Sequence, residues 1–198
     1  MMSETLVKKR TGGRSARVRQ DVLTHALFEL IEQGYMSFNI AQIAKRAAVH
    51  ETTIYRRWPT REALMMDAIS EFANNQLQPS NSGSLAQDLR HNLGLIANLL
   101  QSQIGKTLIM LAFNPGLSPE LRQMTLTLWQ ERLQIGQKIF GYAIQRGEWP
   151  AQYNQHLVFN EVIGPLLTHY FLLQQPITDD LLTQRVDFIL NNRDAFAL

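Results

Sequence analysis

The chain has 198 residues, of which 45% are hydrophobic and none is a cysteine. This composition is typical of a globular protein with a sizeable core, and it excludes disulfides and thiolate chemistry. No stretch is apolar enough to predict a transmembrane helix, and no apolar run follows the basic N-terminal residues as in a signal peptide, so we expect a cytoplasmic protein without a membrane partner.

The net charge of +2 is unevenly distributed along the chain. Met1–Glu62 contains eleven Lys and Arg against six Asp and Glu, whereas Ala63–Leu198 contains eight against eleven. A basic first third on an acidic remainder indicates a head that binds a polyanion, although a basic solvated tail would have the same composition.

Residues 1–17 are predicted to form a flexible basic arm, because they are polar, contain Gly12 and Gly13, and lack apolar periodicity. Such an arm follows the nucleic-acid backbone, enters the minor groove or only adds salt-sensitive affinity. From Val18 to Gly34, apolar residues recur at three- and four-residue steps, which predicts a first helix that ends at the glycine.

Two short helices are predicted next, one over residues 40–47 with Asn39 as its cap and one over residues 51–58 that ends at Pro59. Residues 48–50 would form the turn between them. Small residues at the crossing and polar residues at the start of the second helix are what a helix-turn-helix requires, because the second helix enters the major groove.

The rest of the chain, residues 63–198, is predicted to form a second, helical domain, whose regulatory and dimerising role is what the resemblance described below implies. Thr60 is placed to cap the helix that leads into it, and residues 78–83 form a linker. Further helices are predicted over residues 84–101, 104–113, 118–146, 155–175 and 178–192. No segment alternates with the period of a strand. The predicted fold class is all-α with about nine helices, and a three-helix DNA-binding head over residues 18–62.

Residues 38–64 read FNIAQIAKRAAVHETTIYRRWPTREAL, which resembles the DNA-binding signature of the TetR family of transcriptional regulators. Hydrophobic, small and tyrosine positions coincide with the family pattern without a gap, and with the first helix the resemblance covers Val18–Phe72. The chain departs from the pattern at two positions. The turn glycine is Ala48, and the phosphate-contacting lysine is Arg61, which keeps the charge but changes the donor geometry.

The resemblance implies that Tyr55 and Arg61 contact phosphate and that the start of the second short helix faces base edges. Glu51 either accepts a hydrogen bond from a cytosine amino group or stabilises the helix N-terminus, and Arg57 contacts either a base or a phosphate. Trp58 is expected in the core. The predicted DNA-binding residues are Asn39, Gln42, Glu51, Thr52, Thr53, Tyr55, Arg56, Arg57 and Arg61.

The resemblance also implies a C-terminal domain that dimerises and encloses a ligand pocket. The pocket candidates, each of which is alternatively ordinary core, are His91, Met110, Phe113, Trp129, Leu133, Phe140, Phe159 and Ile163. The last two helices each have an apolar face, which predicts a dimeric four-helix bundle unless those faces pack within one chain. The interface candidates are Leu166, Tyr170, Leu173, Leu182, Val186 and Ile189.

We therefore expect a homodimeric repressor that binds a palindromic site on double-stranded DNA and is released by a small-molecule effector. The alternatives are a DNA-binding regulator that activates or needs no ligand and, in another class, an adaptor for a protein partner. The sequence has no nucleophile elbow, phosphate loop or His-x-x-x-His motif, so we expect no enzyme, no metal and no cofactor.

Overall fold

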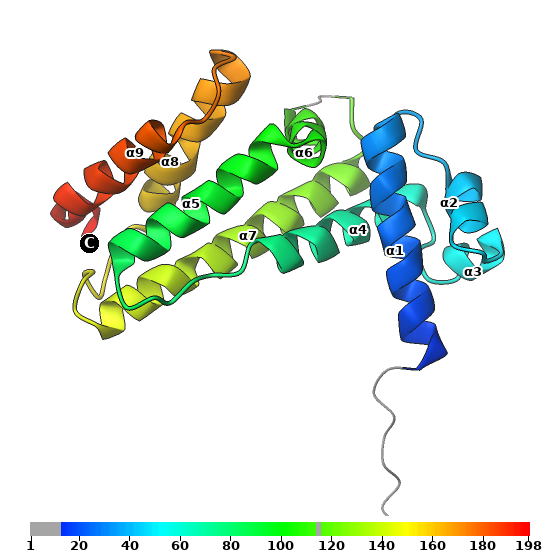
Figure 1. Ribbon diagram of the computed structural model, residues 1–198, viewed down its shortest axis with the longest axis horizontal. Helices are drawn as coiled ribbons and strands as arrows, with labels where there is room; N and C mark the ends of the chain where they lie inside the picture. The colour runs from blue at the N-terminus through cyan, green and yellow to red at the C-terminus, as the bar shows by residue number, and fades with distance from the viewer. Residues whose placement is uncertain (1–12, 114–115) are drawn as a thin grey trace, which may run out of the picture. The chain divides into compact units, whose positions relative to one another are not determined.

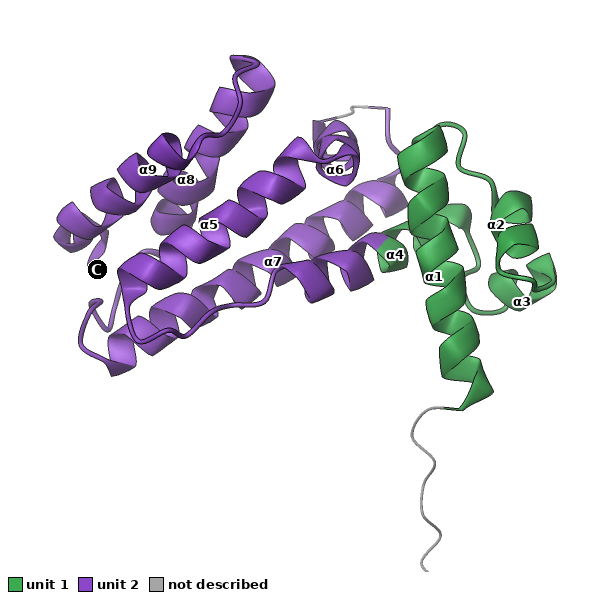
Figure 2. Cartoon of the chain, viewed as in Figure 1, with its two compact units in different colours: residues 1–68 green, residues 69–198 purple. Residues whose placement is uncertain are grey.

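The computed structural model describes residues 13–113 and 116–198 (Figure 1). Over these ranges it contains nine α-helices and no strand, and one isolated β-bridge joins Tyr153 to Ala197. The predicted all-α fold class is confirmed. The chain divides into two units, residues 1–68 and residues 69–198, which we call unit 1 and unit 2 (Figure 2).

Unit 1 consists of three helices and the first half of a fourth, and each of the four contributes apolar residues to its core. The helices are α1 (Arg14–Gln33), α2 (Ile40–Arg46), α3 (Glu51–Tyr55) and α4 (Arg61–Gln76). The largest fully buried side chains are Leu23, Leu30, Ile43, Ile54, Leu64 and Met65. α4 is one continuous helix, of which residues 61–68 belong to unit 1 and residues 69–76 to unit 2.

The boundaries of these helices follow from local capping. Asn39 Oδ1 accepts hydrogen bonds from the backbone N–H groups of Ala41 and Gln42, at 2.8 and 3.3 Å, as its predicted cap role requires. Thr60 Oγ1 accepts from the N–H of Ala63 at 3.1 Å, so that cap is also confirmed.

The first helix begins at Arg14, four residues before its predicted start, so residues 14–17 do not belong to a flexible arm. Gly13 has an extended backbone as the N-cap, and Ser15 is held by the Arg57 guanidinium, whose Nη2 donates to Ser15 Oγ at 2.8 Å. This contact between residues 42 positions apart has no signature in local apolar periodicity. The rest of the predicted arm, residues 1–12, lies outside the described residues.

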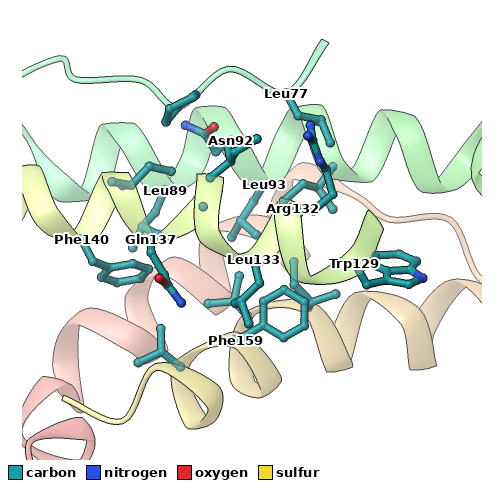
Figure 3. Close-up of a pocket in the computed structure, with 18 of the residues that line it drawn as sticks. Leu77, Leu89, Asn92, Leu93, Trp129, Arg132, Leu133, Gln137, Phe140 and Phe159 are labelled. Carbon is teal, nitrogen blue, oxygen red and sulfur yellow. The ribbon is translucent and has the colours of Figure 1, made fainter. Parts of the chain in front are cut away.

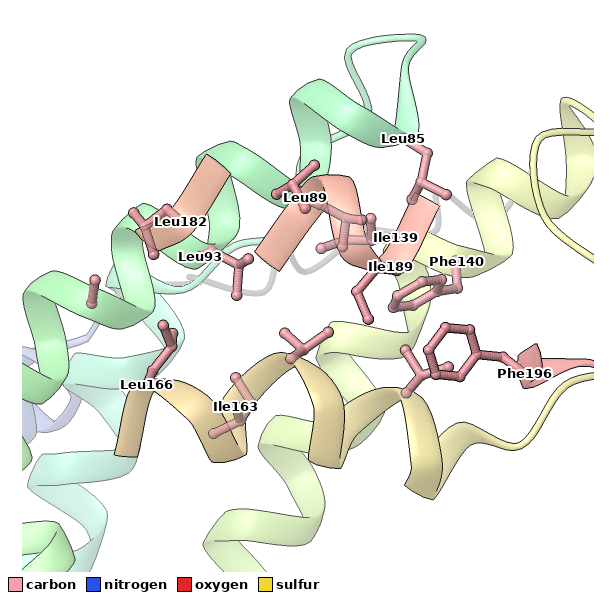
Figure 4. Close-up of a cluster of buried hydrophobic side chains, with 14 of the residues drawn as sticks. Leu85, Leu89, Leu93, Ile139, Phe140, Ile163, Leu166, Leu182, Ile189 and Phe196 are labelled. Atoms are coloured by element: carbon pink, nitrogen blue, oxygen red, sulfur yellow. The ribbon is translucent and has the colours of Figure 1, made fainter. Parts of the chain in front are cut away.

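Unit 2 contains the second half of α4 and all the remaining helices. They are α5 (Leu85–Gln101), α6 (Gln103–Phe113), α7 (Pro119–Gln145), α8 (Gln155–Leu167), the π-helical turn η1 (Thr168–Leu172), α9 (Asp179–Asn191) and the 3₁₀ turn η2 (Arg193–Phe196). Figure 4 shows the core cluster of this unit, to which α5, α7, α8, α9 and η2 all contribute.

A tight corner joins α5 to α6, and the two helices are bent by 78°. Ser102 Oγ donates to the carbonyl of Leu99 at 2.6 Å and accepts from the N–H of Gly105 at 3.2 Å. A Cβ on Gly105 would collide with the backbone of Leu99 and Leu100, so the close approach requires a glycine. In the described residues no single helix is long and apolar enough to cross a membrane, and only α5 and α6 taken together, across this bend, meet those criteria.

A buried ionic network ties the end of α7 to the start of α5. The side chain of Asp88 is fully buried, accepts from the N–H of Ser82 at 2.8 Å, and pairs with the Arg146 guanidinium at 3.4 Å. Arg146 also bonds Glu148 at 2.6 Å, and Glu148 in turn accepts from the N–H of Leu85. Burial opposes the charge on Asp88, but the hydrogen bonds from Ser82 and the nearby arginine outweigh burial and lower the pKa of that carboxyl.

Candidate functional site

The turn between α2 and α3 is closed by backbone hydrogen bonds. The N–H of Ala48 donates to the carbonyl of Lys45 at 3.3 Å, and the N–H of Val49 donates to the carbonyl of Ala44 at 3.0 Å. These bonds are those of a Schellman motif, in which the residue after the helix adopts the left-handed conformation. That residue is Ala48, with φ +51°, at the position where the family pattern has glycine. Its side chain is exposed, so the Cβ causes backbone strain but no collision.

The second short helix, α3, packs one face against the core of unit 1 and exposes the other face to solvent. Ile54 is fully buried, and Trp58, as predicted, lies in the core, where its Nε1 donates to Asp67 Oδ2 at 2.8 Å. Arg19 pairs with the other oxygen of Asp67 at 2.8 Å, which ties α1 to the same point. The predicted base-reading positions therefore face solvent or are half-buried: Glu51, Thr52, Thr53 and Arg56, together with Tyr55 and Gln42.

Two of the predicted DNA-binding arginines already have partners within unit 1. Arg57 donates to Ser15 and lies over the ring of Trp58, 5.7 Å from its centroid. Arg61 donates to Glu62 at 2.8 Å and lies 5.0 Å from the centroid of the Tyr35 ring. The hydrogen bond to Glu62 is the main reason why the pKa of Arg61 is raised.

A shallow basic depression between α1 and α3 contains residues that the sequence analysis did not select. Arg14 and Ser15 line it beside Thr53, Arg56 and Arg57. Both were assigned to the arm because the apolar pattern starts only at Val18. A glycine followed by residues with good helix propensity was the available signal that the helix starts earlier.

Unit 2 contains a cavity of about 130 Å³ between the end of α4 and helices α5, α7 and α8. Five of the eight predicted pocket residues line it: Trp129, Leu133, Phe140, Phe159 and Ile163 (Figure 3). The other three, His91, Met110 and Phe113, do not. His91 is exposed on the outer side of α5, and Met110 and Phe113 are 44% and 75% exposed on α6. The apolar run of α6 buries one face, and these two residues lie on the other.

Arg132 on α7 also lines the cavity, and the sequence analysis did not select it. Its Nη2 donates to Asn74 Oδ1 on α4, whereas its Nε and Nη1 are buried and have no hydrogen-bond partner among the described residues. Burial lowers the pKa of this guanidinium. The signal was in the spacing, because Arg132 lies three residues after Trp129, which places the two on one helix face.

Four of the six predicted dimer residues are buried inside one chain. Leu166, Leu182, Val186 and Ile189 are at most 5% exposed within the core of unit 2, which is the alternative in which these faces pack within one chain. Their apolar faces are covered by α5 and by each other's helices. Tyr170 is half-buried and donates to the carbonyl of Gln101 at 3.4 Å. The apolar residues that remain exposed on α8, η1, α9 and the residue after η1 are Leu157, Leu172, Leu173 and Phe188.

Two family models together match most of the chain. Residues 22–68 match the model of bacterial regulatory proteins of the tetR family, and residues 79–189 match the tetracyclin repressor-like C-terminal domain. The chain belongs to the TetR family. It is therefore a DNA-binding transcriptional regulator, and its helix-turn-helix is formed by α2 and α3.

Individual members of the TetR family resemble the chain over most of its length. The HTH-type transcriptional regulator AqdR of Rhodococcus erythropolis is 28% identical over 178 residues, which are 90% of this chain and 86% of AqdR. The TetR-family regulator SCO0332 has a TM-score of 0.77 at 20% identity, over 88% of this chain and 97% of that one. FadR of Bacillus subtilis, in complex with stearoyl-CoA, has a TM-score of 0.62 at 20% identity, over 86% and 96%. The two structures support the fold.

Proposed function

We propose that this TetR-family regulator is a repressor that binds a palindromic operator as a homodimer and leaves it when a small molecule enters unit 2. The observation that carries the proposal is an apolar cavity with a few polar groups in the unit that does not carry the helix-turn-helix. FadR of Bacillus subtilis, which has the same fold, binds stearoyl-CoA. Because its target is DNA in a bacterial cell, we place the protein in the cytoplasm, without catalytic activity.

On the DNA side, we assign the reading of bases to the exposed start of α3. Thr52, Thr53 and Arg56 would contact base edges, and an arginine can bind guanine with two hydrogen bonds. Tyr55 and Arg61 would contact phosphates, and Asn39 and Gln42 of the α2 region would lie near the DNA backbone. For Arg57 we favour a phosphate contact, because its guanidinium is held against Ser15 and Trp58 rather than free to reach into the groove.

Glu51 is the unusual residue of this surface. Its carboxylate lies in the first turn of α3, where it stabilises the positive end of the helix. It is also exposed, so it can accept a hydrogen bond from a cytosine amino group. Both roles are compatible with repression at a specific site.

The route between ligand and DNA would be α4. Ala73 near its end lines the cavity and its first residues belong to unit 1, so a shift along this one helix would reach both units. A ligand that binds better to the conformation that does not bind DNA would release the operator, and couplings of this kind amount to about 1–3 kcal/mol.

A selection of binding sites from random duplexes at fixed salt tests the DNA role. We expect one palindromic site, and Arg56→Ala should weaken binding to it by about tenfold or more while relaxing the preference at one base position of each half-site. Tyr55→Phe and Arg61→Ala should weaken binding to all duplexes to a similar degree. Lys45→Ala, which removes an exposed charge from α2, is the control with a small effect.

Binding of all duplexes alike, with no preferred site, would contradict the proposal. Wild-type behaviour of the Tyr55→Phe, Arg61→Ala double variant would favour the adaptor for a protein partner instead. Reporter expression with and without the regulator then separates a repressor from an activator, and the response to added metabolites separates both from a regulator that needs no ligand.

A further inference from the structure

The wall of the cavity combines many apolar side chains with a single charge. Of the described residues that line it, only Arg132 carries a charged side chain. Figure 3 shows this side chain reaching from α7 toward Leu77. The polar side chain of Asn92 is already engaged, since its Nδ2 donates to Ser80 Oγ at 2.7 Å and to the carbonyl of Asp88 at 2.9 Å. Gln137, Tyr153 and Gln155 also line the cavity, so a ligand meets one guanidinium together with neutral polar groups.

Several hydrogen-bond donors of Arg132 have no acceptor in the structure. A guanidinium has five N–H donors, and here the donor groups Nε and Nη1 are buried without an acceptor. Its one hydrogen bond goes to the neutral amide oxygen of Asn74, and the carboxylate of the neighbouring Glu131 favours its charge only through space, without an ion pair. The side chain as a whole is half-buried, but its Nε and Nη1 groups are shielded from solvent, and buried donors without a partner cost free energy, so the site lacks an acceptor, preferably an anionic one.

The size of the cavity limits the apolar part of that acceptor. A volume of about 130 Å³ is close to that of an apolar cavity of about 150 Å³ that binds benzene. The space suits one aromatic ring or a short alkyl chain packed against Trp129, Leu133 and Phe159. A carboxylate fits the planar fork of an arginine with two parallel hydrogen bonds.

We propose that the cavity binds a small hydrophobic carboxylate, whose anionic group pairs with Arg132 and whose apolar part fills the space beside Trp129 and Phe159. The carboxylate takes the place of Asn74 at the guanidinium, which releases a contact that α7 makes to α4. The inference names the effector class of the proposed function and rests on it, but the binding chemistry is tested without DNA.

Calorimetric titration of the full chain with octanoate, octanol and octylammonium tests the pairing. We expect octanoate to bind about ten- to a hundredfold more tightly than octanol, because a hydrogen bond to a charged group adds that much, and octylammonium to bind most weakly. Arg132→Met should bring octanoate and octanol within about twofold of each other and leave octanol unchanged. Lys138→Met, which removes an exposed charge from the same helix, should change neither.

Equal affinities of octanoate and octanol in the wild-type chain, or a preference for octanoate that survives Arg132→Met, would overturn the proposal. No binding of octanoate would also overturn it. If Arg132→Met unfolds, Arg132→Lys carries the test, since it keeps the charge but loses the two-pronged geometry and should lie between wild type and the neutral analogue. Operator binding by the ligand-free chain is measured separately, so a failed ligand assignment leaves the DNA role standing.

Discussion

A left-handed alanine, Ala48, closes the helix-turn-helix at the point where the family has glycine. An L-residue with a Cβ loses about 1–2 kcal/mol in this conformation, and glycine does not. We expect Ala48→Gly to raise the free energy of unfolding by about 1 kcal/mol, measured by urea denaturation, because the exposed methyl contributes no packing.

The neighbouring alanine is the matched control for that change. Ala47 has φ −80°, where an alanine is unstrained, so Ala47→Gly should lower the free energy of unfolding by about 0.5–1 kcal/mol. The same sign for both substitutions would contradict strain at Ala48. A gain in stability with unchanged operator affinity would show that the turn itself does not touch DNA.

Among the elements, the corner between α5 and α6 depends on one glycine. A Cβ on Gly105 would collide with the backbone of Leu99 and Leu100. Gly105→Ala should therefore lower the free energy of unfolding, measured by chemical denaturation, by about 1–3 kcal/mol, which is the range for overpacked sites. Gly94→Ala on α5 is the control. Nothing lies within 4 Å of its added Cβ, so it should stabilise the helix by about 0.5–1 kcal/mol. Equal effects of the two changes would rule out the close approach.

The elements that the sequence predicted best are those with local stop and start signals. Asn39, Thr60 and the Ser118-Pro119 pair begin helices as predicted, and Gly34 and Gly147 have positive φ at the helix ends. Caps depend on residues three or four positions apart, which a sequence displays directly. The start of α1 was missed because the apolar pattern begins only at Val18, although Gly13 and the residues after it carried a local signal.

Positions within the site were harder to predict, for a different reason. Periodicity shows that α8 and α9 have apolar faces but not what covers them, and Leu166 and Ile189 are covered by their own chain. Likewise, Phe113 is apolar yet points outward, while Arg132 is charged yet lines the cavity. Tertiary packing decides these cases, and helical spacing shows only which residues share a face, as for Arg132 and Trp129.

At the scale of the whole molecule, the Asp88 network makes unit 2 sensitive to acid. The pKa of Asp88 is lowered, and that of Glu148 is lowered by its hydrogen bond to Arg146. Both carboxylates therefore stabilise the fold fully above the pKa of about 4 that they have when unfolded. This contribution is lost as the pH falls below that value toward their folded pKa, because the unfolded chain then binds more protons.

Substitution of Asp88 tests this linkage. Asp88→Asn should lower the free energy of unfolding by about 1–3 kcal/mol at pH 7 and flatten its decline between about pH 4 and pH 2, as measured by urea denaturation at each pH. Asp187→Asn, at an exposed position of α9, is the control and should leave the profile as in the wild type. An unchanged slope in Asp88→Asn would show that other groups cause the acid sensitivity.

The proposed homodimer makes a prediction at the same scale. Leu172 and Leu173 are 75% and 56% exposed at the end of the α8 and η1 segment, where apolar side chains have no cover from their own chain. A Leu172→Glu, Leu173→Glu variant should sediment as a monomer at concentrations where the wild type is a dimer, and it should lose operator affinity. Leu126→Glu on α7, at a leucine that is 50% exposed, should remain a dimer. A dimeric double variant would place the interface elsewhere.

The final turn of the chain also has a practical consequence for protein engineering. Phe196 is buried against Trp149, and the N–H of Leu198 donates to the carbonyl of Gln152. Trp149 in turn packs edge-on against Tyr153, which lines the cavity. Trimming by a carboxypeptidase or replacement of residues 193–198 by an affinity tag would thus loosen the packing behind the wall of the cavity in unit 2.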